Sequence, residues 1–311
     1  MANIIGIDGG GTKTSFCLLN TAENRKSYLK SGETNFKNIG IEKTKENMGS
    51  GLKKILKQEN LAIGDIDCFV LGAAGCDTEK DYAVFKEILG DIGIKDRIFI
   101  YNDAKIAFKA CSAKDGIIII SGTGSISFSY NKNRENRLGG WGAEISDIGS
   151  GYWIGRKFLK DLLLYLENLY PKDVIFQEFI EKYIKDSDPF EYIQENFTDV
   201  KSIASITKFV LTAESKYTDE LAHEISGFFY TVTDKLYKDF NGGKIDLVLS
   251  GSVIKNEKIY GLLEEKILHT DKMKNINIIL NDKEAVEGCL NLALEILNSK
   301  GEKNENLSAG F

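Results

Sequence analysis

A run of three glycines, followed by hydroxyl and amine side chains, lies between two apolar stretches near the start of the chain. The segment reads NIIGIDGGGTKTSFCLLN over residues 3–20. Glycine accepts positive φ and lets a ligand approach the backbone, where successive N–H groups can bind phosphate oxygens. A tight hairpin turn is the simpler interpretation, because glycines also satisfy it. The candidate phosphate-binding residues are Gly9, Gly10, Gly11, Thr12, Lys13 and Thr14.

The spacing excludes two common phosphate motifs. A Walker loop needs Gly-Lys-Ser/Thr, whereas Gly11 is followed by Thr12 and Lys13. The dinucleotide motif needs a glycine where Thr14 stands, and a helix where a strand is expected. What remains is a hairpin with Asp8 at the end of its first strand. A carboxylate there can hold Mg²⁺ through water beside phosphates, because Mg²⁺ keeps most of its hydration shell.

A second segment repeats this plan. GIIIISGTGSISFSYN, residues 116–131, is again an apolar strand, a glycine-rich tip and a second strand, about 113 positions after the first. The repeat predicts a duplicated fold with a cleft between its halves, in which Gly122, Thr123, Gly124 and Ser125 would hold the same triphosphate from the opposite lobe. We expect the lobe boundary near residues 112–115. The N-terminal lobe would then be 1–112, completed by a helix at about 284–298, and the C-terminal lobe 113–283.

Composition narrows the partners. The chain has 311 residues, 42% of them hydrophobic, which suits two lobes better than one core. A net charge of −6 provides no basic surface for nucleic acid or an anionic membrane, so a small ligand is expected. No apolar run is long enough to span a membrane, and we expect a soluble, cytoplasmic protein. The five cysteines lack a close CxxC pair and are interpreted as buried thiols.

Apolar periodicity predicts an α/β protein. Helical stripes are expected around residues 48–56, 82–89 and 154–169, and most of 174–240 is interpreted as a helical insertion broken by Pro171 and Pro189. Residues from Ser299 onward are expected to fray. The expected strands are Ile4–Asp8, Thr14–Asn20, Cys68–Ala73, Arg97–Tyr101, Gly116–Ser121, Ile126–Tyr130, Ile245–Ser250 and Ile276–Leu280.

Three further segments carry candidate site residues. In YNDAKIAF, Asp103 begins a helix, where an N-cap role is the default interpretation. In GGWGAEISDIGSGYWIG, Gly139, Gly140 and Gly142 give backbone freedom, while Ser150 is expected to cap a helix and Trp153 to pack in the core. Gly251 and Ser252 lie between a strand and a helix, which suits a backbone pressed against a nucleoside. Gly288, inside a helix, predicts close helix packing.

Together these motifs resemble the sugar kinase, heat-shock protein and actin superfamily. Within it they are similar to the N-acetylglucosamine kinase group of the BadF/BadG/BcrA/BcrD ATPase family, over nearly the whole chain. The motifs that carry the resemblance are GIDGGGTKT, YNDAKIAF, SGTGS, GGWGAEISDIGSGYWIG and LVLSGSVIKN. The family's usual Gly-Asp-Glu-Gly-Ser differs here at Ser146 and Ile148, and Ile148 removes a carboxylate.

The resemblance implies a two-lobed actin-like ATPase fold, of the ribonuclease H-like type, whose last helix returns to the N-terminal lobe. It implies an ATP- and Mg²⁺-dependent kinase that acts on the 6-hydroxyl of an amino sugar, N-acetylglucosamine or N-acetylmuramic acid, and works as a homodimer. Asp103 would accept the proton of the sugar hydroxyl, Asp8 would serve the metal, and Gly251 and Ser252 the adenosine. The implied sugar contacts are Asn35, Gly75, Asn102, Asp103, Trp141, Gly142 and Asp147.

Several alternatives stay open at this point. Glucosamine is the nearest competing substrate. An ATPase activator of a radical dehydratase shares the fold, but its second loop is usually built on Asp-Ile-Gly-Gly, and here residues 121–124 read SGTG. ROK sugar kinases carry a Cys-rich zinc motif that this sequence lacks. A sugar-sensing binding protein is the non-enzymatic alternative.

Overall fold

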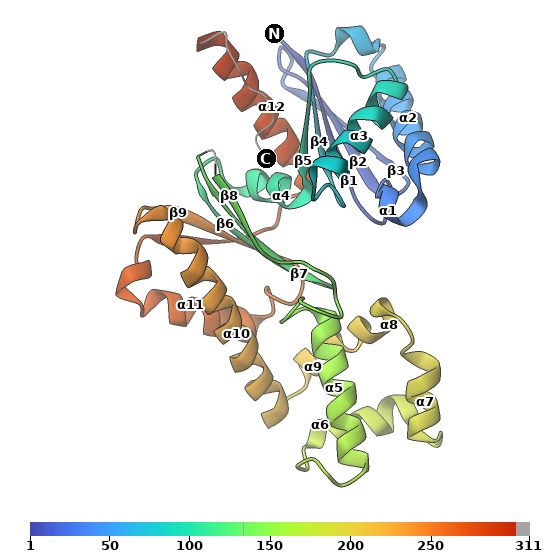
Figure 1. Ribbon diagram of the computed structural model, residues 1–311, viewed down its shortest axis with the longest axis vertical. Helices are drawn as coiled ribbons and strands as arrows, with labels where there is room; N and C mark the ends of the chain where they lie inside the picture. Colours follow the sequence, from blue (N-terminus) through green and yellow to red (C-terminus); the bar gives the residue numbers. More distant parts are fainter. Residues whose placement is uncertain (133, 303–311) are drawn as a thin grey trace. The chain divides into compact units, whose positions relative to one another are not determined.

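The computed structural model describes residues 1–132 and 134–302, and the chain divides into two compact units. Unit 1 comprises Met1–Ala113 together with the segment that starts at Asp282, and unit 2 is Lys114–Asn281. Each unit contains one five-stranded sheet covered by helices (Figure 1). Among the described residues, none of the helices has the length and apolar character needed to cross a membrane.

The sheet of unit 1 has the order β3-β2-β1-β4-β5. β1 pairs with β2 antiparallel and with β4 parallel, and β4 pairs with β5 parallel. The strands are β1 (Asn3–Gly9), β2 (Thr14–Asn20), β3 (Arg25–Ser31), β4 (Cys68–Ala73) and β5 (Ile98–Asn102). The helical elements are α1 (Phe36–Ile39), α2 (Ile41–Gln58), η1 (Ile63–Asp65), α3 (Glu79–Asp91), α4 (Asp103–Cys111) and α12 (Ala285–Glu302).

Two hydrophobic cores cover the two faces of this sheet. Alternate residues of a strand point to opposite faces, and Ile5 packs with Leu52 of α2 and Phe85 of α3. The neighbouring Ile4 packs instead with residues of α4 and α12, among them Ile106 and Cys289. The chain's last helix therefore belongs to the first unit, as the resemblance implied.

The sheet of unit 2 has the order β10-β9-β6-β7-β8, which matches unit 1 strand for strand when it is read from β8. The duplicated sheet predicted from the sequence is confirmed. Its strands are β6 (Gly116–Ser121), β7 (Ser125–Asn131), β8 (Arg134–Gly139), β9 (Ile245–Ser250) and β10 (Ile276–Leu280). The helical elements are α5 (Gly151–Leu166), α6 (Val174–Phe179), η2 (Ile180–Ile184), α7 (Pro189–Asn196), α8 (Val200–Ser205), α9 (Thr207–Thr212), α10 (Lys216–Tyr237), η3 (Lys238–Phe240), α11 (Glu257–Leu268) and η4 (Asp271–Met273).

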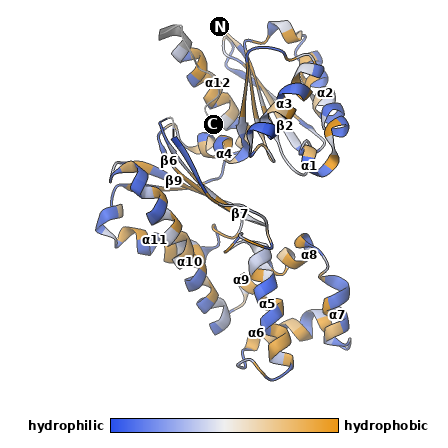
Figure 2. Cartoon of the chain, in the orientation of Figure 1, coloured by the Kyte–Doolittle hydropathy of each residue, from blue (hydrophilic) through white to orange (hydrophobic). Residues whose placement is uncertain are grey.

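An aromatic cluster fills the helical half of unit 2. Phe158 of α5 lies 5.0 Å, between ring centroids, from Phe179 and 5.6 Å from Phe176 of α6, a helix that is largely hydrophobic in Figure 2. The Tyr217 hydroxyl donates a hydrogen bond of 2.9 Å to the buried Asp161 carboxylate. The same core includes Ile119 of the sheet, so the helical segment and the sheet share one core.

Most sequence-based boundaries are confirmed, and the errors have physical causes. The edge strands β3 and β8 were not predicted, because their residues are largely polar and lack an apolar face. The helical segment is interrupted at residues 185–188, as predicted, and Pro189 then begins α7, where its missing N–H costs nothing. Leu169 lies beyond α5 and is exposed. Ser299 is still within α12, and the rest of the expected frayed tail, from residue 303, lies outside the described residues.

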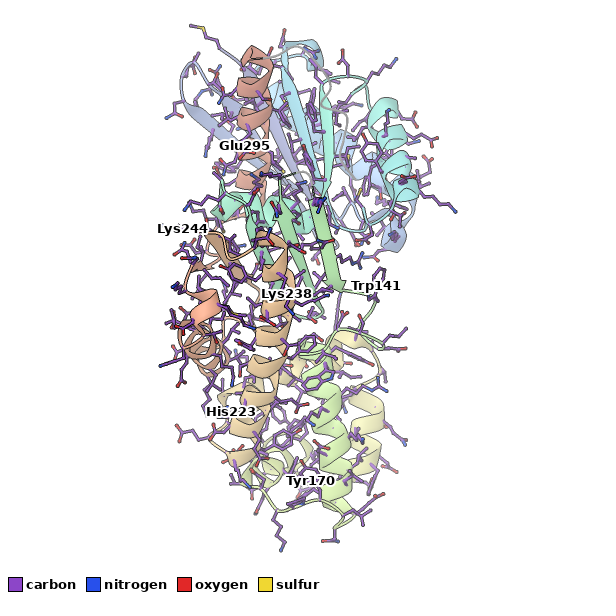
Figure 3. The ribbon with its side chains drawn as sticks, turned by 60° about the vertical axis from the view of Figure 1, so that its left-hand side comes forward. Trp141, Tyr170, His223, Lys238, Lys244 and Glu295 are labelled. Atoms are coloured by element: carbon purple, nitrogen blue, oxygen red, sulfur yellow. The ribbon has the colours of Figure 1, made fainter. Side chains whose placement is uncertain are left out.

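The cysteines behave as expected, and the histidines lie at the surface. Four cysteines, Cys17, Cys68, Cys76 and Cys289, are buried thiols, and Cys111 is half-buried. Both histidines are exposed; Figure 3 shows His223 on α10. Neither residue type has a place in the sites described below.

Gly288 sets how closely α12 can approach α4. A Cβ built on Gly288 would lie 1.8 Å from the carbonyl oxygen of Ile106 and 2.7 Å from the backbone nitrogen of Ala110. Backbone atoms cannot move aside as a flexible side chain can. The close packing predicted for this glycine is therefore confirmed.

We expect Gly288→Ala to lower the free energy of unfolding by about 1–3 kcal/mol, the usual cost of overpacking, because α12 must move away from α4. Chemical denaturation measures this. The matched control is Gly261→Ala in α11, where a Cβ would meet no atom within 4 Å. At position 261 the higher helix propensity of alanine should raise the free energy of unfolding by as much as about 1 kcal/mol. Equal effects of the two substitutions would contradict the close-packing argument.

Candidate functional site

Parallel pairing brings the ends of three strands of unit 1 into one row. Gly9 of β1 pairs with Ala73 of β4, and Ala73 pairs with Asn102 of β5. The Ala74 N–H donates a hydrogen bond of 2.8 Å to the Gly9 carbonyl, which extends the pairing beyond β4. Residues next to these positions come from distant parts of the sequence and lie along the same edge of the sheet.

The first glycine loop is closed by short contacts. The Gly10 N–H donates to the Lys13 carbonyl at 3.1 Å, and a Cβ on Gly9 would lie 2.7 Å from the Thr34 hydroxyl oxygen. None of the three glycines, all of them described, has a positive φ. The expectation of positive φ was therefore wrong for this loop, and lack of space for a side chain explains Gly9 and Gly10.

Thr14 differs from its neighbours in this loop. Its side chain is fully buried, and its hydroxyl lies 2.8 Å from both the Gly32 carbonyl oxygen and the Thr34 hydroxyl oxygen. Gly11, Thr12 and Lys13 are exposed. The side chains available to a ligand in this loop are thus those of Thr12 and Lys13.

Asp8 lies close to two other carboxylates, those of Asp103 and Glu284. Burial raises the pKa of its carboxyl from 3.8 to about 6, and the Asp103 carboxylate adds to the rise. Lys13 opposes the increase, and Glu284 contributes a smaller one. A cation at this position would offset the repulsion between Asp8 and Asp103, so the donor chemistry fits Mg²⁺ held by one carboxylate with water and phosphate oxygens. Within 1–132 and 134–302, His, Cys, Asp and Glu side chains form no group of three or more that could hold a metal ion.

The helix that follows β5 is capped by Asn102. The Asn102 side chain accepts a hydrogen bond of 2.8 Å from the Ala104 N–H, and Asp103 is the first residue of α4. The default interpretation of Asp103 as the N-cap was therefore wrong by one position. Asp103 is half-buried, and the capping requirement does not explain an aspartate there.

A polar cluster surrounds Gly75, which has φ +83°. A Cβ on Gly75 would lie 2.7 Å from Oδ1 of Asn35, the residue that caps α1. Asn102 donates to the Asp77 carboxylate at 3.1 Å, and the Lys37 ammonium lies 3.5 Å from the same carboxylate. The structure thus brings together three predicted sugar contacts. Lys37 and Asp77 were missed, because only the tertiary fold places them here.

In unit 2, the second glycine loop joins two neighbouring segments through the backbone. The Gly151 N–H donates to the Gly122 carbonyl at 2.7 Å, and the Tyr152 N–H to the Thr123 carbonyl at 3.1 Å. The Ser125 hydroxyl donates to the Ile148 carbonyl at 2.9 Å. The start of α5 is therefore fixed to this loop, and Ser150 caps α5 as predicted, through the Trp153 N–H.

Gly251 brings the turn after β9 to the same place. It has φ +97°, and a Cβ would lie 2.2 Å from the Ser121 carbonyl oxygen. The Val253 N–H donates to that same carbonyl at 3.0 Å. Only glycine fits this approach, so Ser252 and the second glycine loop become neighbours.

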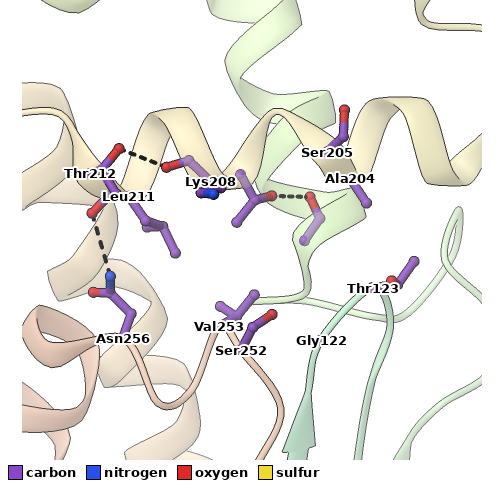
Figure 4. A pocket seen from close by; sticks show the side chains of 12 residues that line it. Gly122, Thr123, Ala204, Ser205, Lys208, Leu211, Thr212, Ser252, Val253 and Asn256 are labelled. Carbon is purple, nitrogen blue, oxygen red and sulfur yellow. Dashed lines mark hydrogen bonds between the residues drawn. The ribbon is translucent and has the colours of Figure 1, made fainter.

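These segments border a pocket of about 580 Å³ (Figure 4). The pocket contains Gly122 and Thr123 of the predicted phosphate loop and Ser252 of the predicted adenosine turn. Its other walls come from α8, α9 and the start of α11, which the sequence did not connect with a ligand. The lining residues are Gly122, Thr123, Gly151, Ala204, Ser205, Thr207, Lys208, Leu211, Thr212, Ser252, Val253 and Asn256.

Gly122 differs from the other glycines of unit 2 that line this pocket. A Cβ on Gly122 would meet no protein atom within 4 Å, and its φ is not positive. A Cβ on Gly151, by contrast, would lie 3.1 Å from the Gly122 carbonyl oxygen. Neither packing nor conformation requires glycine at position 122.

The loop between β8 and α5 carries the remaining predicted residues. Gly139, Gly140 and Gly142 all have positive φ, which confirms the predicted backbone freedom. Trp141 is 67% exposed, and the Arg137 guanidinium lies 4.3 Å from its ring centroid; Figure 3 labels Trp141 beyond the end of β8.

Asp147 is buried and lies against the second glycine loop. The Ser146 hydroxyl donates to its Oδ1 at 3.1 Å, and a Cβ on Gly124 would lie 2.6 Å from its Oδ2. Gly124 therefore makes room for the carboxylate. Within unit 2, the structure brings Asp147 and the residues 122–125 together.

Comparison with known proteins agrees with these motifs. The model of the BadF/BadG/BcrA/BcrD ATPase family matches residues 5–288. The chain belongs to this family.

Two relatives of this ATPase are sugar kinases by name. An N-acetylmuramic acid/N-acetylglucosamine kinase of Clostridium acetobutylicum is 30% identical over 267 residues, 82% of this chain and 87% of the relative. An N-acetyl-D-glucosamine kinase of Dictyostelium discoideum is 28% identical over 318 residues, 95% of this chain and 98% of the relative.

The fold of this ATPase is also that of a candidate N-acetylglucosamine kinase from Chromobacterium violaceum. The TM-score is 0.68 at 18% identity, over 94% of this chain and 99% of the other. The duplicated sheets with their helices are those of the actin-like ATPase fold. The expectation of this fold is confirmed.

The raised pKa of Asp8 predicts a pH-dependent stability. Protonated Asp8 favours the fold, so its contribution is fully present below pH 3.8 and is lost as the pH rises through about 6. Asp8→Asn places an uncharged side chain at this position. It should therefore raise the free energy of unfolding of the metal-free protein at pH 8 by up to about 3 kcal/mol, and the melting temperature with it. The difference should shrink towards pH 4. Scanning calorimetry across this range tests it, and a difference that does not change with pH would contradict it.

Proposed function

We propose that this ATPase transfers the γ-phosphoryl group of ATP to the 6-hydroxyl of an amino sugar. N-acetylglucosamine is the first candidate and N-acetylmuramic acid the second. The names of the relatives support the substrate class. The observation that carries the assignment is Asp103, a half-buried aspartate beside Asp8 that is not needed to cap its helix.

Phosphoryl transfer asks the protein mainly for alignment and charge neutralisation, because its transition state is loose. Asp103 accepts the proton from the sugar hydroxyl late in the reaction, and a carboxylate ionised at neutral pH is sufficient for this. Asn35 and Asn102, at the polar cluster around Gly75, bind the sugar. Mg²⁺, when bound beside Asp8, neutralises charge on the phosphates.

The pocket of unit 2 binds the adenosine and part of the triphosphate. Its volume of about 580 Å³ is in the usual range for small-molecule sites. Gly122 supports this use, since a ligand lying against the backbone would explain a glycine that the protein's own packing does not require. Gly124, Thr123, Ser125, Gly251 and Ser252 contribute to the same half of the site. From the resemblance, we also propose a homodimer that acts in the cytoplasm.

Asp103→Asn should lower kcat by about 10²–10⁴, the usual contribution of a positioned acid–base group, with little change in ATP affinity. A coupled ADP-release assay measures the rate, and titration of a non-hydrolysable ATP analogue measures affinity. Because Asn102 is the cap, Asp103→Asn should not destabilise the protein, and loss of the repulsion with Asp8 should stabilise it when no metal is bound. Asn102→Ala, in contrast, should cost about 1 kcal/mol. Near-normal turnover of Asp103→Asn with any of the sugars would refute its role.

Gly122→Ala should raise the KM for ATP by about tenfold, equivalent to 1.4 kcal/mol, while the melting temperature stays that of the wild type. The added methyl group enters the pocket without touching the protein. Gly251→Ala is the contrasting variant, since its Cβ would clash with Ser121 and lower stability. Unchanged ATP kinetics in a well-folded Gly122→Ala protein would contradict the proposal that ATP binds in this pocket.

The choice between N-acetylglucosamine, N-acetylmuramic acid and glucosamine is made by the same ADP-release assay with each sugar in turn. If glucosamine gives the highest kcat/KM, the glucosamine kinase alternative replaces the first candidate. If ATP turnover is absent with every sugar, the kinase proposal fails and a sugar-binding role becomes the better explanation.

A further inference from the structure

A second cavity, of about 480 Å³, lies in unit 2 beside α5. We call it the α5 cavity. One wall is the loop of residues 143–148, and the other consists of α5 side chains at positions 152, 153, 156, 157 and 160. This spacing marks one face of a helix. Gly155 lies against Ile203 of α8, and Gly151 lines the nucleotide pocket. The nucleotide pocket and the α5 cavity therefore lie on different faces of the same helix.

The helical wall of the α5 cavity is basic. Arg156 and Lys160 are exposed, and Lys157 is half-buried. Arg156 donates to the backbone carbonyl of Glu144 at 3.3 Å, which brings its guanidinium to the opposite wall. The Lys157 ammonium lies 3.6 Å from the Glu224 carboxylate of α10.

Two carboxylates line the same cavity. Glu144 is exposed, and Asp147 is buried and accepts the Ser146 hydroxyl. Three cations thus face two cavity carboxylates, and Glu224 lies behind Lys157. Among the described residues, Arg156 and Lys160 form no ion pair, so these two cations are available to an anionic ligand. An anionic group is favoured beside them.

The walls also offer apolar surface. Tyr152 and Trp153 lie on the helical side, and Ile145, which is 86% exposed, lies on the loop side. A ligand that combines a carbon skeleton with one negative charge would be complementary to this cavity. A bare inorganic anion would leave the apolar walls uncovered.

Asp147 connects the α5 cavity to the reaction. It lines this cavity, and its Oδ2 also lies against Gly124 of the second glycine loop. The family resemblance implies that Asp147 contacts the acceptor sugar, and this inference rests on that role and on the proposed function. A substituent that projects from that sugar past Asp147 would enter the cavity.

We propose that the α5 cavity binds a carboxylate-bearing substituent of the acceptor, so that Arg156 and Lys160 select acidic amino sugars over neutral ones. The carboxylate accepts hydrogen bonds from the Lys160 ammonium and the Arg156 guanidinium, and the carbon chain of the substituent covers Trp153. N-acetylmuramic acid, whose lactyl ether carries the carboxylate, is the test ligand.

The experiment compares three acceptors in the ADP-release assay: N-acetylmuramic acid, N-acetylglucosamine and its 3-O-methyl ether, which adds bulk without charge. Lys160→Gln should lower kcat/KM for N-acetylmuramic acid by about tenfold through KM, the loss expected for one charge-assisted hydrogen bond. It should change the values for the two neutral sugars by less than about twofold. Lys160→Glu should widen the difference.

Lys216→Gln is the matched control, because Lys216 is a highly exposed lysine of α10 that forms an ion pair with Glu220, one turn along the same helix. It should leave all three acceptors unchanged. Equal losses with acidic and neutral sugars, or no loss with N-acetylmuramic acid, would overturn the inference. So would a wild-type protein that phosphorylates only the neutral sugars, although the proposed function would then stand. If no sugar is phosphorylated, the proposed function fails and this inference fails with it.

Discussion

Parallel pairing of β1, β4 and β5 is the constraint on which the candidate site of unit 1 depends. The register that aligns Gly9, Ala73 and Asn102 brings three distant chain segments to one edge of the sheet. The same register holds Asp8 near Asp103; burial raises the pKa of Asp8, and the Asp103 carboxylate adds to the rise. Burial of the strand residues between two helical layers stabilises the sheet against this repulsion. The fold therefore maintains a charge arrangement that a bound cation would relieve.

Unit 2 has the same strand order as unit 1, but its loops line a pocket of different composition. β6 and β9 are parallel neighbours, and the turns after them meet where Gly251 lies against the Ser121 carbonyl. Backbone hydrogen bonds from Gly151 and Tyr152 then attach α5 to the glycine loop. Because these contacts involve backbone atoms, they leave side chains and the open face of Gly122 available to the pocket. One helix thus separates a pocket suited to a nucleotide from a basic cavity of different chemistry.

The sequence was sufficient for the sheets and the glycine loops, because strand periodicity and repeated motifs are local signals. It failed where a single position or a tertiary contact decided the outcome. Asn and Asp cap helices about equally well, so the sequence alone could not distinguish Asn102, which caps α4, from Asp103, its first residue. Asp77 contacts Asn102, and Lys37 contacts Asp77, only because the fold brings them together. The α8 and α9 residues that line the pocket of unit 2 have the composition of any amphipathic helix. Polar edge strands gave no periodic signal at all.

At Ile148, where the family resemblance leads one to expect an acidic residue, the loop is held by backbone contacts. The Ile148 carbonyl accepts the Ser125 hydroxyl, and the Ile148 N–H donates to the Ser146 carbonyl at 2.7 Å. Both contacts use the backbone, so they do not depend on the side chain, which is 38% exposed. Among residues 146–148, Asp147 alone retains a carboxylate. Any charged contact between this segment and an acceptor therefore falls to Asp147, whose orientation is set by Ser146 and by the space that Gly124 leaves.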